Sequence, residues 1–260
     1  MTKLEKLKAD LRGLGELAVA FSGGADSSLL LRAAHDALGA RAIGITIRSP
    51  YMSSREIAEA VEFASVYGIR HEILELGVGD EIKDNPENRC YLCKKAVFSR
   101  LIERARELGF SRVADGTNRD DLGEHRPGLK AKEELGVLSP LINLTKSEIR
   151  ELSRELSLPT AEKPGYACLL TRLPHGREIK PDELNLIEAA ENLLIASGYA
   201  NVRARCDRKN IKLQMPFSSM RDFLNDAKFK SIVRQLVTLG AAEVTLDLKG
   251  LREDVLHERG

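Results

Sequence analysis

The chain has 260 residues, 43% of them hydrophobic, and a formal net charge of +1 at neutral pH. This length allows one large domain or two modest ones with a substantial core. The charge balance argues against a nucleic-acid partner, because covering a phosphate backbone requires a surplus of Lys and Arg. No apolar run approaches the roughly 20 residues of a membrane span, and the charged N-terminal segment lacks an apolar signal core. We therefore expect a cytoplasmic protein without a membrane partner.

The segment Phe21–Ser28 reads FSGGADSS. An apolar run precedes it and a periodic apolar segment follows it, a pattern that indicates strand, tight turn and helix. Glycines let the backbone approach a ligand closely, and a helix N-terminus favours phosphate. The Lys-Ser/Thr of the Walker loop is absent, and so is the third glycine of dinucleotide-binding loops.

This segment is similar to the SGGxDS signature of the PP-loop ATP pyrophosphatase superfamily. Its members cleave ATP between the α and β phosphates and adenylate a carbonyl or carboxyl oxygen. The resemblance implies that Asp26 is a Mg²⁺ ligand beside the phosphates. The alternative is an ordinary glycine turn with a capping residue. The expected ATP contacts from this loop are Ser22, Gly23, Gly24, Asp26, Ser27 and Ser28.

Strands alternate with helices through the first two thirds of the chain. Predicted strands cover 41–47, 72–76 and 112–114, and predicted helices begin near Ser53, Cys93 and Thr145. Ser53 with Glu56, and Thr145 with Glu148, have the spacing of capping boxes. This order predicts an α/β fold with a Rossmann-like parallel sheet, helices on both faces, and a ligand at the carboxyl ends of the strands.

Two further groups of polar residues fall at strand ends. Thr46 ends one predicted strand, and Asp115, Gly116, Thr117 and Asn118 follow another. We expect these residues to contact the nucleotide. The alternative for the second group is a polar turn that caps a helix.

The pattern changes after Pro159. An irregular segment over 163–179 is followed by a predicted helix at 183–197, paired strands at 201–206 and 211–215, a mostly helical stretch at 218–239 and a last strand at 242–248. These elements form a small α/β unit of their own. We therefore expect a PP-loop domain over 1–170 and a smaller α/β domain for substrate binding or oligomerisation over 171–260.

The four cysteines are Cys90, Cys93, Cys168 and Cys206. In a cytosolic chain of this size they do not indicate a disulfide framework. Cys90 and Cys93 form a C-x-x-C, which fits a redox pair, half of a zinc site or part of an iron–sulfur site. Two ordinary thiols at a helix start are the alternative.

Several blocks resemble the LarE family, whose members are ATP-dependent sulfur transferases that mature the nickel-pincer nucleotide cofactor of lactate racemase. The blocks cover residues 85–95, 115–121, 125–131 and 163–172. The resemblance implies adenylation of a carboxylate of pyridinium-3,5-biscarboxylic acid mononucleotide, attack by sulfur, and release of AMP. It also implies a homo-oligomer. The sulfide donor is not indicated.

The family has two sulfur sources. One branch gives up the sulfur of a single cysteine, matching Cys168 here. The other has three cysteines and a [4Fe–4S] cluster whose fourth iron carries an extra sulfide. Cys90, Cys93 and Cys168 match the second branch, with Cys206 outside the cluster. A zinc site is the alternative for the metal, with a fourth ligand from Cys206, His125 or His175.

The resemblance also implies substrate-binding residues, for which ordinary surface charge is the alternative. They are Arg126, Lys130, Arg172, Glu191, Arg203 and Arg205. A guanidinium suits bidentate binding of a carboxylate or phosphate. Residues 165–166 and 170–171 differ from those most common around this cysteine in the family, so the identity of the sulfur acceptor stays open.

Three other functions compete with this interpretation. A tRNA thiolase of the same superfamily would also use three cysteines and a cluster. An amidotransferase-like ligase or NAD-synthetase-like enzyme would use ammonia and need no cysteine. A non-enzymatic iron–sulfur or persulfide carrier would keep a degenerate ATP loop.

Overall fold

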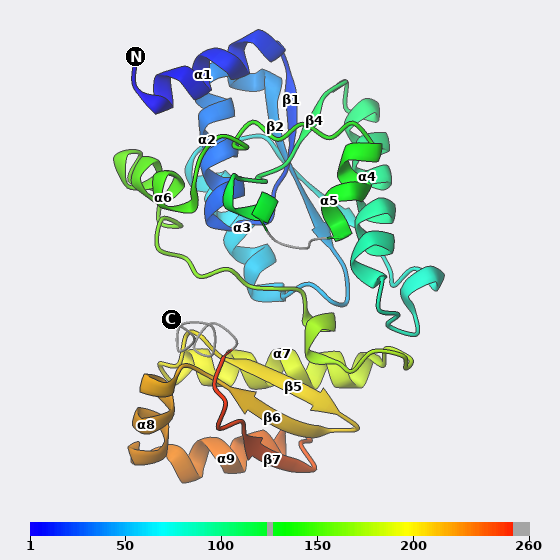
Figure 1. Cartoon of the computed structure of the whole chain (residues 1–260), viewed down its shortest axis with the longest axis vertical. Coiled ribbons are helices and arrows are strands. Elements are labelled where there is room, and N and C mark those ends of the chain that lie inside the picture. The colour runs from blue at the N-terminus through cyan, green and yellow to red at the C-terminus, as the bar shows by residue number, and fades with distance from the viewer. Residues whose placement is uncertain (124–126, 252–260) are drawn as a thin grey trace. The chain divides into compact units, whose positions relative to one another are not determined.

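The computed structural model describes residues 1–123 and 127–251. Two compact units make up the chain (Figure 1). The first comprises Met1–Ile82 and Glu87–Tyr166, and the second comprises Lys83–Pro86 and the chain from Ala167 onward. The functional division expected at residue 170 stays a prediction.

A four-stranded parallel sheet forms the centre of the first unit, with the strand order β3-β2-β1-β4. Because all four strands run in one direction, the loops that follow them emerge at the same edge of the sheet. The strands are β1 (Leu17–Ala20), β2 (Ala42–Arg48), β3 (His71–Glu75) and β4 (Val113–Ala114). The helices are α1 (Lys3–Leu14), α2 (Ala25–Leu38), α3 (Ser54–Val66), α4 (Arg89–Glu107), α5 (Pro127–Glu134) and α6 (Lys146–Glu155).

Both faces of this sheet are covered. Leu17 and Val19 of β1 belong to one buried cluster, which also contains side chains of α1, α2, α3 and α6. Ala18, which points to the opposite face, belongs to a second cluster with Val97 and Leu101 of α4. Figure 1 shows α2 and α4 on opposite sides of the strands. The predicted Rossmann-like sheet with helices on both faces is confirmed.

The predicted helix starts near Ser53 and Thr145 are confirmed, whereas the one near Cys93 differs. Thr145 and Glu148 form the predicted capping box at α6. Ser53 is the N-cap of α3, but its side chain makes no capping hydrogen bond, so the capping box predicted for Ser53 and Glu56 is wrong. Helix α4 begins at Arg89 rather than Cys93, since the carbonyl of Asn88 already accepts from the backbone N–H of Tyr91 and Leu92.

The second unit contains a three-stranded mixed sheet of order β5-β6-β7. Its elements are α7 (Pro181–Ala196), β5 (Arg203–Asp207), β6 (Asn210–Gln214), α8 (Phe217–Asn225), α9 (Phe229–Thr238) and β7 (Glu243–Leu246). The predicted pairing of β5 with β6 is confirmed and is antiparallel. The mostly helical stretch expected over 218–239 forms two helices, α8 and α9. Asp226 interrupts it, because its carboxylate accepts from the Tyr199 hydroxyl at 2.8 Å and from the backbone N–H of Lys228 at 2.7 Å.

Within residues 1–123 and 127–251, no helix is both long enough and apolar enough to span a lipid bilayer.

Candidate active site

The loop between β1 and α2 is shaped by its glycines and its own hydroxyl groups. Gly23 has φ of +70°, and a Cβ at this position would lie 3.1 Å from the Cβ of Ala60 on α3. Only glycine meets both conditions without strain. The hydroxyls of Ser22 and Ser27 lie 3.1 Å apart, and the Ser27 hydroxyl donates to the carbonyl of Gly24 at 3.2 Å. Both serines, predicted to contact ATP, therefore also hold the loop in its turn.

The first turn of α2 has no side-chain cap at its N-terminus. Gly24 is its N-cap and has no side chain to satisfy the N–H groups that follow. The loop after β4 lies directly against this turn, since a Cβ on Gly116 would approach the backbone nitrogen of Ser27 and the Cβ of Asp26 to 3.0 Å. The structure thus brings together two loops that the sequence predicted at the nucleotide. Ser28 is fully buried, and its hydroxyl has no partner among the described residues.

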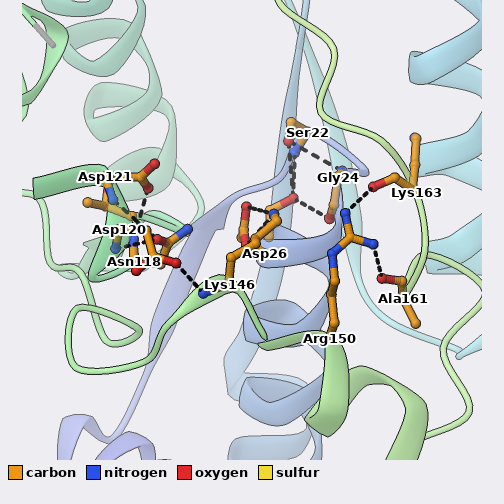
Figure 2. A network of polar contacts seen from close by, with 12 residues as sticks. Ser22, Gly24, Asp26, Asn118, Asp120, Asp121, Lys146, Arg150, Ala161 and Lys163 are labelled. Atoms are coloured by element: carbon orange, nitrogen blue, oxygen red, sulfur yellow. Dashed lines mark hydrogen bonds and ion pairs between the residues drawn. The ribbon is translucent and has the colours of Figure 1, made fainter. Parts of the chain in front are cut away.

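Asp26 pairs with a lysine that sequence reasoning missed. Nζ of Lys146 lies 2.7 Å from both carboxylate oxygens of Asp26 (Figure 2). The backbone N–H of Lys146 donates to a carboxylate oxygen of Asp120 at 2.7 Å, at the start of α6. The predicted Mg²⁺ ligand therefore has a cation beside it already. The assignment of Asp26 as a Mg²⁺ ligand stays a prediction.

A second missed lysine contacts the glycine loop itself. Nζ of Lys163 donates to the carbonyl of Gly23 at 2.8 Å and pairs with Glu59 of α3 at 2.6 Å. The guanidinium of Arg150, one turn after Lys146 on α6, donates to the carbonyl of Ala161 at 2.9 Å. Figure 2 shows the Arg150 side chain reaching from α6 to Ala161 and Lys163 in the segment that follows this helix.

Asp115 is held by a buried cation. Its carboxylate accepts from the ammonium of Lys132, from the Thr117 hydroxyl at 2.7 Å and from the Ser139 hydroxyl at 2.9 Å. Burial is the largest single influence and raises the pKa of Asp115, but the charge of Lys132 and these hydrogen bonds together hold the pKa below its usual value. The buried side chains of Asp115 and Thr117 therefore stabilise the loop after β4.

Asn118 shapes the next turn. Its side-chain oxygen accepts from the backbone N–H groups of Asp120 and Asp121, while its own N–H donates to the Asp121 carboxylate at 3.0 Å. This is the polar turn that the sequence offered as the alternative. Direct nucleotide contacts from Asp115, Gly116, Thr117 and Asn118 stay predictions.

Thr46 ties β2 to the strand that enters the glycine loop. Its hydroxyl donates to the carbonyl of Phe21 at 2.7 Å, and Nε2 of His71 lies 2.8 Å from the same hydroxyl. Because the Thr46 proton is used, His71 is the donor to its oxygen. Burial lowers the pKa of His71, which favours the neutral ring. An ATP contact from Thr46 stays a prediction.

The C-x-x-C lies on the first turn of α4. Cys90 is exposed and Cys93 is partly buried, and neither forms a disulfide. Residues three apart on a helix share one face, so both thiols project from the same side. The hydroxyl of buried Tyr51 lies 3.4 Å from Sγ of Cys93. Burial raises the pKa of the Cys93 thiol, and the Tyr51 hydrogen bond opposes this.

Cys168 opens a short 3-10 turn, Leu169–Arg172, in the second unit. Its carbonyl accepts from the backbone N–H and the hydroxyl of Thr171, at 3.0 and 2.9 Å. The described ranges contain no group of three or more His, Cys, Asp or Glu side chains that could hold a metal ion. Cys206 is buried on β5, and burial raises the pKa of its thiol to about 11.

Three predicted substrate residues form a network behind this turn. Arg172, only 3% exposed, pairs with Glu191 at 2.7 and 3.3 Å. Glu191 also accepts from the backbone N–H of Ala204 at 2.9 Å. Arg205 donates to Gln214 at 2.6 Å and to the carbonyl of Thr171 at 3.0 Å.

The remaining predicted substrate residues are less constrained. Arg203 is half-buried on β5, and Lys130 is exposed on α5. Arg126 and His125 lie outside the described residues. Substrate contacts from these residues, and from the network of Arg172, Glu191 and Arg205, stay predictions.

A glycine loop of this form, between the first strand of a parallel sheet and a helix, with Asp26 in the helix's first turn, defines the PP-loop class of ATP-using enzymes. No family model matches the chain. A pyridinium-3,5-bisthiocarboxylic acid mononucleotide synthase of Lactiplantibacillus plantarum is 34% identical over 264 residues, covering 99% of this chain and 94% of that protein. The chain therefore belongs to the family of that synthase, the LarE family, and is an ATP-dependent sulfurtransferase.

Two other relatives extend the comparison. An uncharacterized protein of Synechocystis is 36% identical over 260 residues, covering 98% of this chain and 97% of that protein. A tRNA-specific 2-thiouridylase of Caldanaerobacter subterraneus is 28% identical over 190 residues, covering 56% of this chain and 52% of that protein. The first supports a family whose members match over their full length, and the second supports membership of the wider PP-loop class.

Proposed function

We propose that the chain adenylates a carboxylate of pyridinium-3,5-biscarboxylic acid mononucleotide with Mg-ATP and converts it to a thiocarboxylate, with release of AMP. A carboxylate oxygen attacks the α-phosphorus, and the bond to the β-phosphate breaks as pyrophosphate leaves. A sulfur nucleophile then attacks the acyl carbon, and the carbon–oxygen bond to AMP breaks. The near full-length match to a synthase of the bisthiocarboxylic acid mononucleotide supports this choice of acceptor.

The single observation that carries the adenylation step is the pair of Asp26 and Lys146 at the start of α2. Bound phosphates would meet the N–H groups of the helix turn, and Asp26 would hold Mg²⁺, which neutralises phosphate charge when bound. Lys146, displaced from Asp26, keeps its ammonium within reach of the same phosphates. The arrangement supplies positive charge where the leaving pyrophosphate develops negative charge.

For sulfur delivery we assign Cys90, Cys93 and Cys168 as ligands of a [4Fe–4S] cluster. Thiolates are the donors that such clusters require, and none of these three forms a disulfide. Cys90 and Cys93 project from one helix face, which fits two ligands of one metal group. When bound, the cluster supplies a site for the transferable sulfide.

Within the second unit, the acceptor would be held by its phosphate and carboxylates. Arg203 on β5 fits this task. The family resemblance adds Arg126 and Lys130 as proposed substrate contacts. Arg172, Glu191 and Arg205 would act mainly through the backbone around Thr171, because Arg172 is already paired with Glu191, and Arg205 with Gln214 and the Thr171 carbonyl.

The test is performed on protein purified without oxygen. Iron and acid-labile sulfide are measured per chain for the native sequence, Cys168→Ala and the control Cys206→Ala, and product is followed by mass spectrometry with ATP, Mg²⁺, sulfide and the mononucleotide. We expect about four irons per chain, lost in Cys168→Ala but kept in Cys206→Ala, together with thiocarboxylate and AMP. No thiocarboxylate from any preparation would overturn the proposed acceptor.

Absence of iron with product limited to one turnover would overturn the cluster. Loss of the sulfur of Cys168 in the same sample would then identify this residue as a sacrificial donor. Stoichiometric zinc with retained activity would assign the cysteines to zinc instead.

The match to a tRNA-specific 2-thiouridylase favours tRNA as a second candidate acceptor. The balanced charge of +1 argues against it. Binding of tRNA at physiological salt, followed by thiolation of a uridine, would establish this second function. Binding of tRNA that is seen only at low salt would exclude this second function.

A further inference from the structure

Lys163 lies where three parts of the first unit meet. Its ammonium bonds the carbonyl of Gly23 in the glycine loop and the carboxylate of Glu59 on α3, and its side chain is only 11% exposed. Glu59 in turn bonds Arg55 at 2.7 Å. Burial raises the pKa of Glu59, but hydrogen bonds and charge from Lys163 and Arg55 outweigh this and lower it, so the carboxylate stays ionised.

The hydrogen bond from Lys163 to the Gly23 carbonyl affects the Gly24 N–H at the proposed phosphate site, because both groups belong to one peptide. The Gly23 carbonyl and the Gly24 N–H belong to the same planar unit, so fixing the carbonyl also fixes the N–H. Gly23 adopts φ of +70°, and a Cβ added to it would lie 3.1 Å from the Cβ of Ala60, so this peptide is closely confined. An anion bound to the loop N–H groups polarises the peptide and makes the carbonyl a stronger acceptor for Lys163.

The other end of the contact is the segment that leads to Cys168. The backbone of Lys163 is held by its N–H, which donates to Thr160 at 3.1 Å, and by its carbonyl, which accepts from Arg150 at 3.5 Å. Three residues later, the ring of Tyr166 lies 4.8 Å from the guanidinium of Arg55. Cys168 follows five positions after Lys163 in the chain. Lys163, which bonds the glycine loop, therefore belongs to the same chain segment as the proposed sulfur ligand Cys168.

We propose that Lys163 is a positioning residue that couples occupancy of the ATP loop to the order of the Cys168 segment. The coupling rests on the proposed function, since it gives adenylation a way to prepare sulfur delivery. Bound ATP strengthens the hydrogen bond between the Gly23 carbonyl and Lys163, and the fixed Lys163 reduces the motion of the chain that follows it. By linkage, order in that segment strengthens ATP binding to the same degree.

The coupling is measured by hydrogen exchange of the peptide covering residues 164–172, on the intact chain, with and without saturating Mg²⁺ and α,β-methylene ATP. Saturation is set by calorimetry for each variant. In the native protein the nucleotide should slow exchange by at least about fivefold. Lys163→Met should bind the nucleotide and lose most of this slowing, and Lys163→Arg should restore part of it.

Arg154→Met is the matched control. Arg154 bonds Glu162, the neighbour of Lys163, on the exposed side of the same segment, and among the described residues it has no hydrogen bond or ion pair with the glycine loop. This variant should keep the full nucleotide effect. Glu59→Gln keeps the Gly23 contact and weakens the ion pair, so it should reduce the effect and serves as the second variant if Lys163→Met does not fold.

An unchanged nucleotide effect in Lys163→Met or Glu59→Gln would overturn the proposal, as would no effect in the native protein. The assay contains no acceptor and needs no turnover. The exchange assay can therefore contradict the coupling while the activity assay confirms sulfur transfer to the mononucleotide. Coupling can likewise be observed in a protein that fails to transfer sulfur.

Discussion

Nζ of Lys146 lies 2.7 Å from each carboxylate oxygen of Asp26, although the two residues are 120 positions apart in the chain. Asp26 lies in the first turn of α2, directly after the glycine loop, whereas Lys146 begins α6 near the end of the first unit. The pair satisfies a carboxylate that would otherwise repel incoming phosphates. In the proposed reaction, binding of Mg-ATP would break the pair and make the ammonium available to the nucleotide.

Replacing Lys146 by Met should lower the rate of pyrophosphate release on the order of 10²-fold, because a positive charge aimed at the phosphates is lost. The rate is measured with saturating Mg-ATP and acceptor. Lys3→Met is the control. Lys3, on α1, is an exposed ion-pair partner of Glu148, which lies on the same helix as Lys146, and this substitution should leave the rate unchanged. A native rate in Lys146→Met would show that the pair serves the fold alone.

Replacing Lys132 by Met should destabilise the protein by about 3–5 kcal/mol, because it leaves the carboxylate of Asp115 buried without its cation. Side chains of Asp115 and Lys132 are 10% and 11% exposed. The free energy of unfolding is measured in urea. Lys95→Met, which removes an exposed pair with Glu134, should change it little. Lys132→Met combined with Asp115→Asn should recover much of the loss.

The same pair predicts a pH dependence. The pKa of Asp115 is lower in the folded state than its ordinary value of 3.8, so its stabilising contribution is fully present above that value. The contribution is lost as pH falls through the depressed folded pKa. Unfolding free energies measured from neutral pH down to about pH 3 should fall more steeply for the native protein than for Asp115→Asn. Parallel curves would contradict the assignment.

The sequence revealed the parts of the site that depend on local patterns. The glycine loop, the parallel sheet and the capping box of Thr145 and Glu148 follow from short-range periodicity and turn chemistry, and the structure confirms them. In the second unit, the break at Asp226 was not visible because it depends on Tyr199, which is 27 positions away.

The basic residues of the site were missed for the same reason. Lys146, Lys132 and Lys163 resemble solvated charges in a chain with 40 Lys and Arg residues. Their partners lie far away in sequence, and only the folded sheet brings the loops after β1 and β4 together. The one available signal is the position of Lys146 beside a strong helix cap, where a cation is unusual, since helix N-termini favour acidic residues.

Cys206 should be dispensable for sulfur transfer. Its thiol is 1% exposed, and burial raises its pKa to about 11. In the folded protein at about pH 8, iodoacetamide should therefore label exposed Cys90 and leave Cys206 unmodified, as peptide mass spectrometry would reveal. Cys206→Ala should retain the native rate of thiocarboxylate formation. Rapid labelling of Cys206, or loss of activity in this variant, would contradict its exclusion from the chemistry.

Cys206 also has a pH signature of the opposite sign to that of Asp115. Because its folded pKa is raised above the ordinary value of 9.0, its stabilising contribution is present below that pH and is lost as pH rises toward 11. Between about pH 8 and pH 10, the free energy of unfolding should fall more for the native protein than for Cys206→Ala.

Arg172 and Glu191 allow a positioning role to be separated from substrate binding. Removing either partner of this buried pair, as Arg172→Met or Glu191→Met, should cost about 3–5 kcal/mol of unfolding free energy, because one buried charge is left alone. The double variant should regain most of that stability, since two apolar side chains fill the same space.

Activity should not return with stability in this double variant. Arg172 bonds the hydroxyl of Thr171 at 2.6 Å, and that hydroxyl in turn holds the carbonyl of Cys168. Without these bonds the Cys168 turn is less ordered, so kcat for thiocarboxylate formation should fall while KM for the mononucleotide stays near its native value. A raised KM with unchanged kcat would instead assign Arg172 and Glu191 to substrate binding.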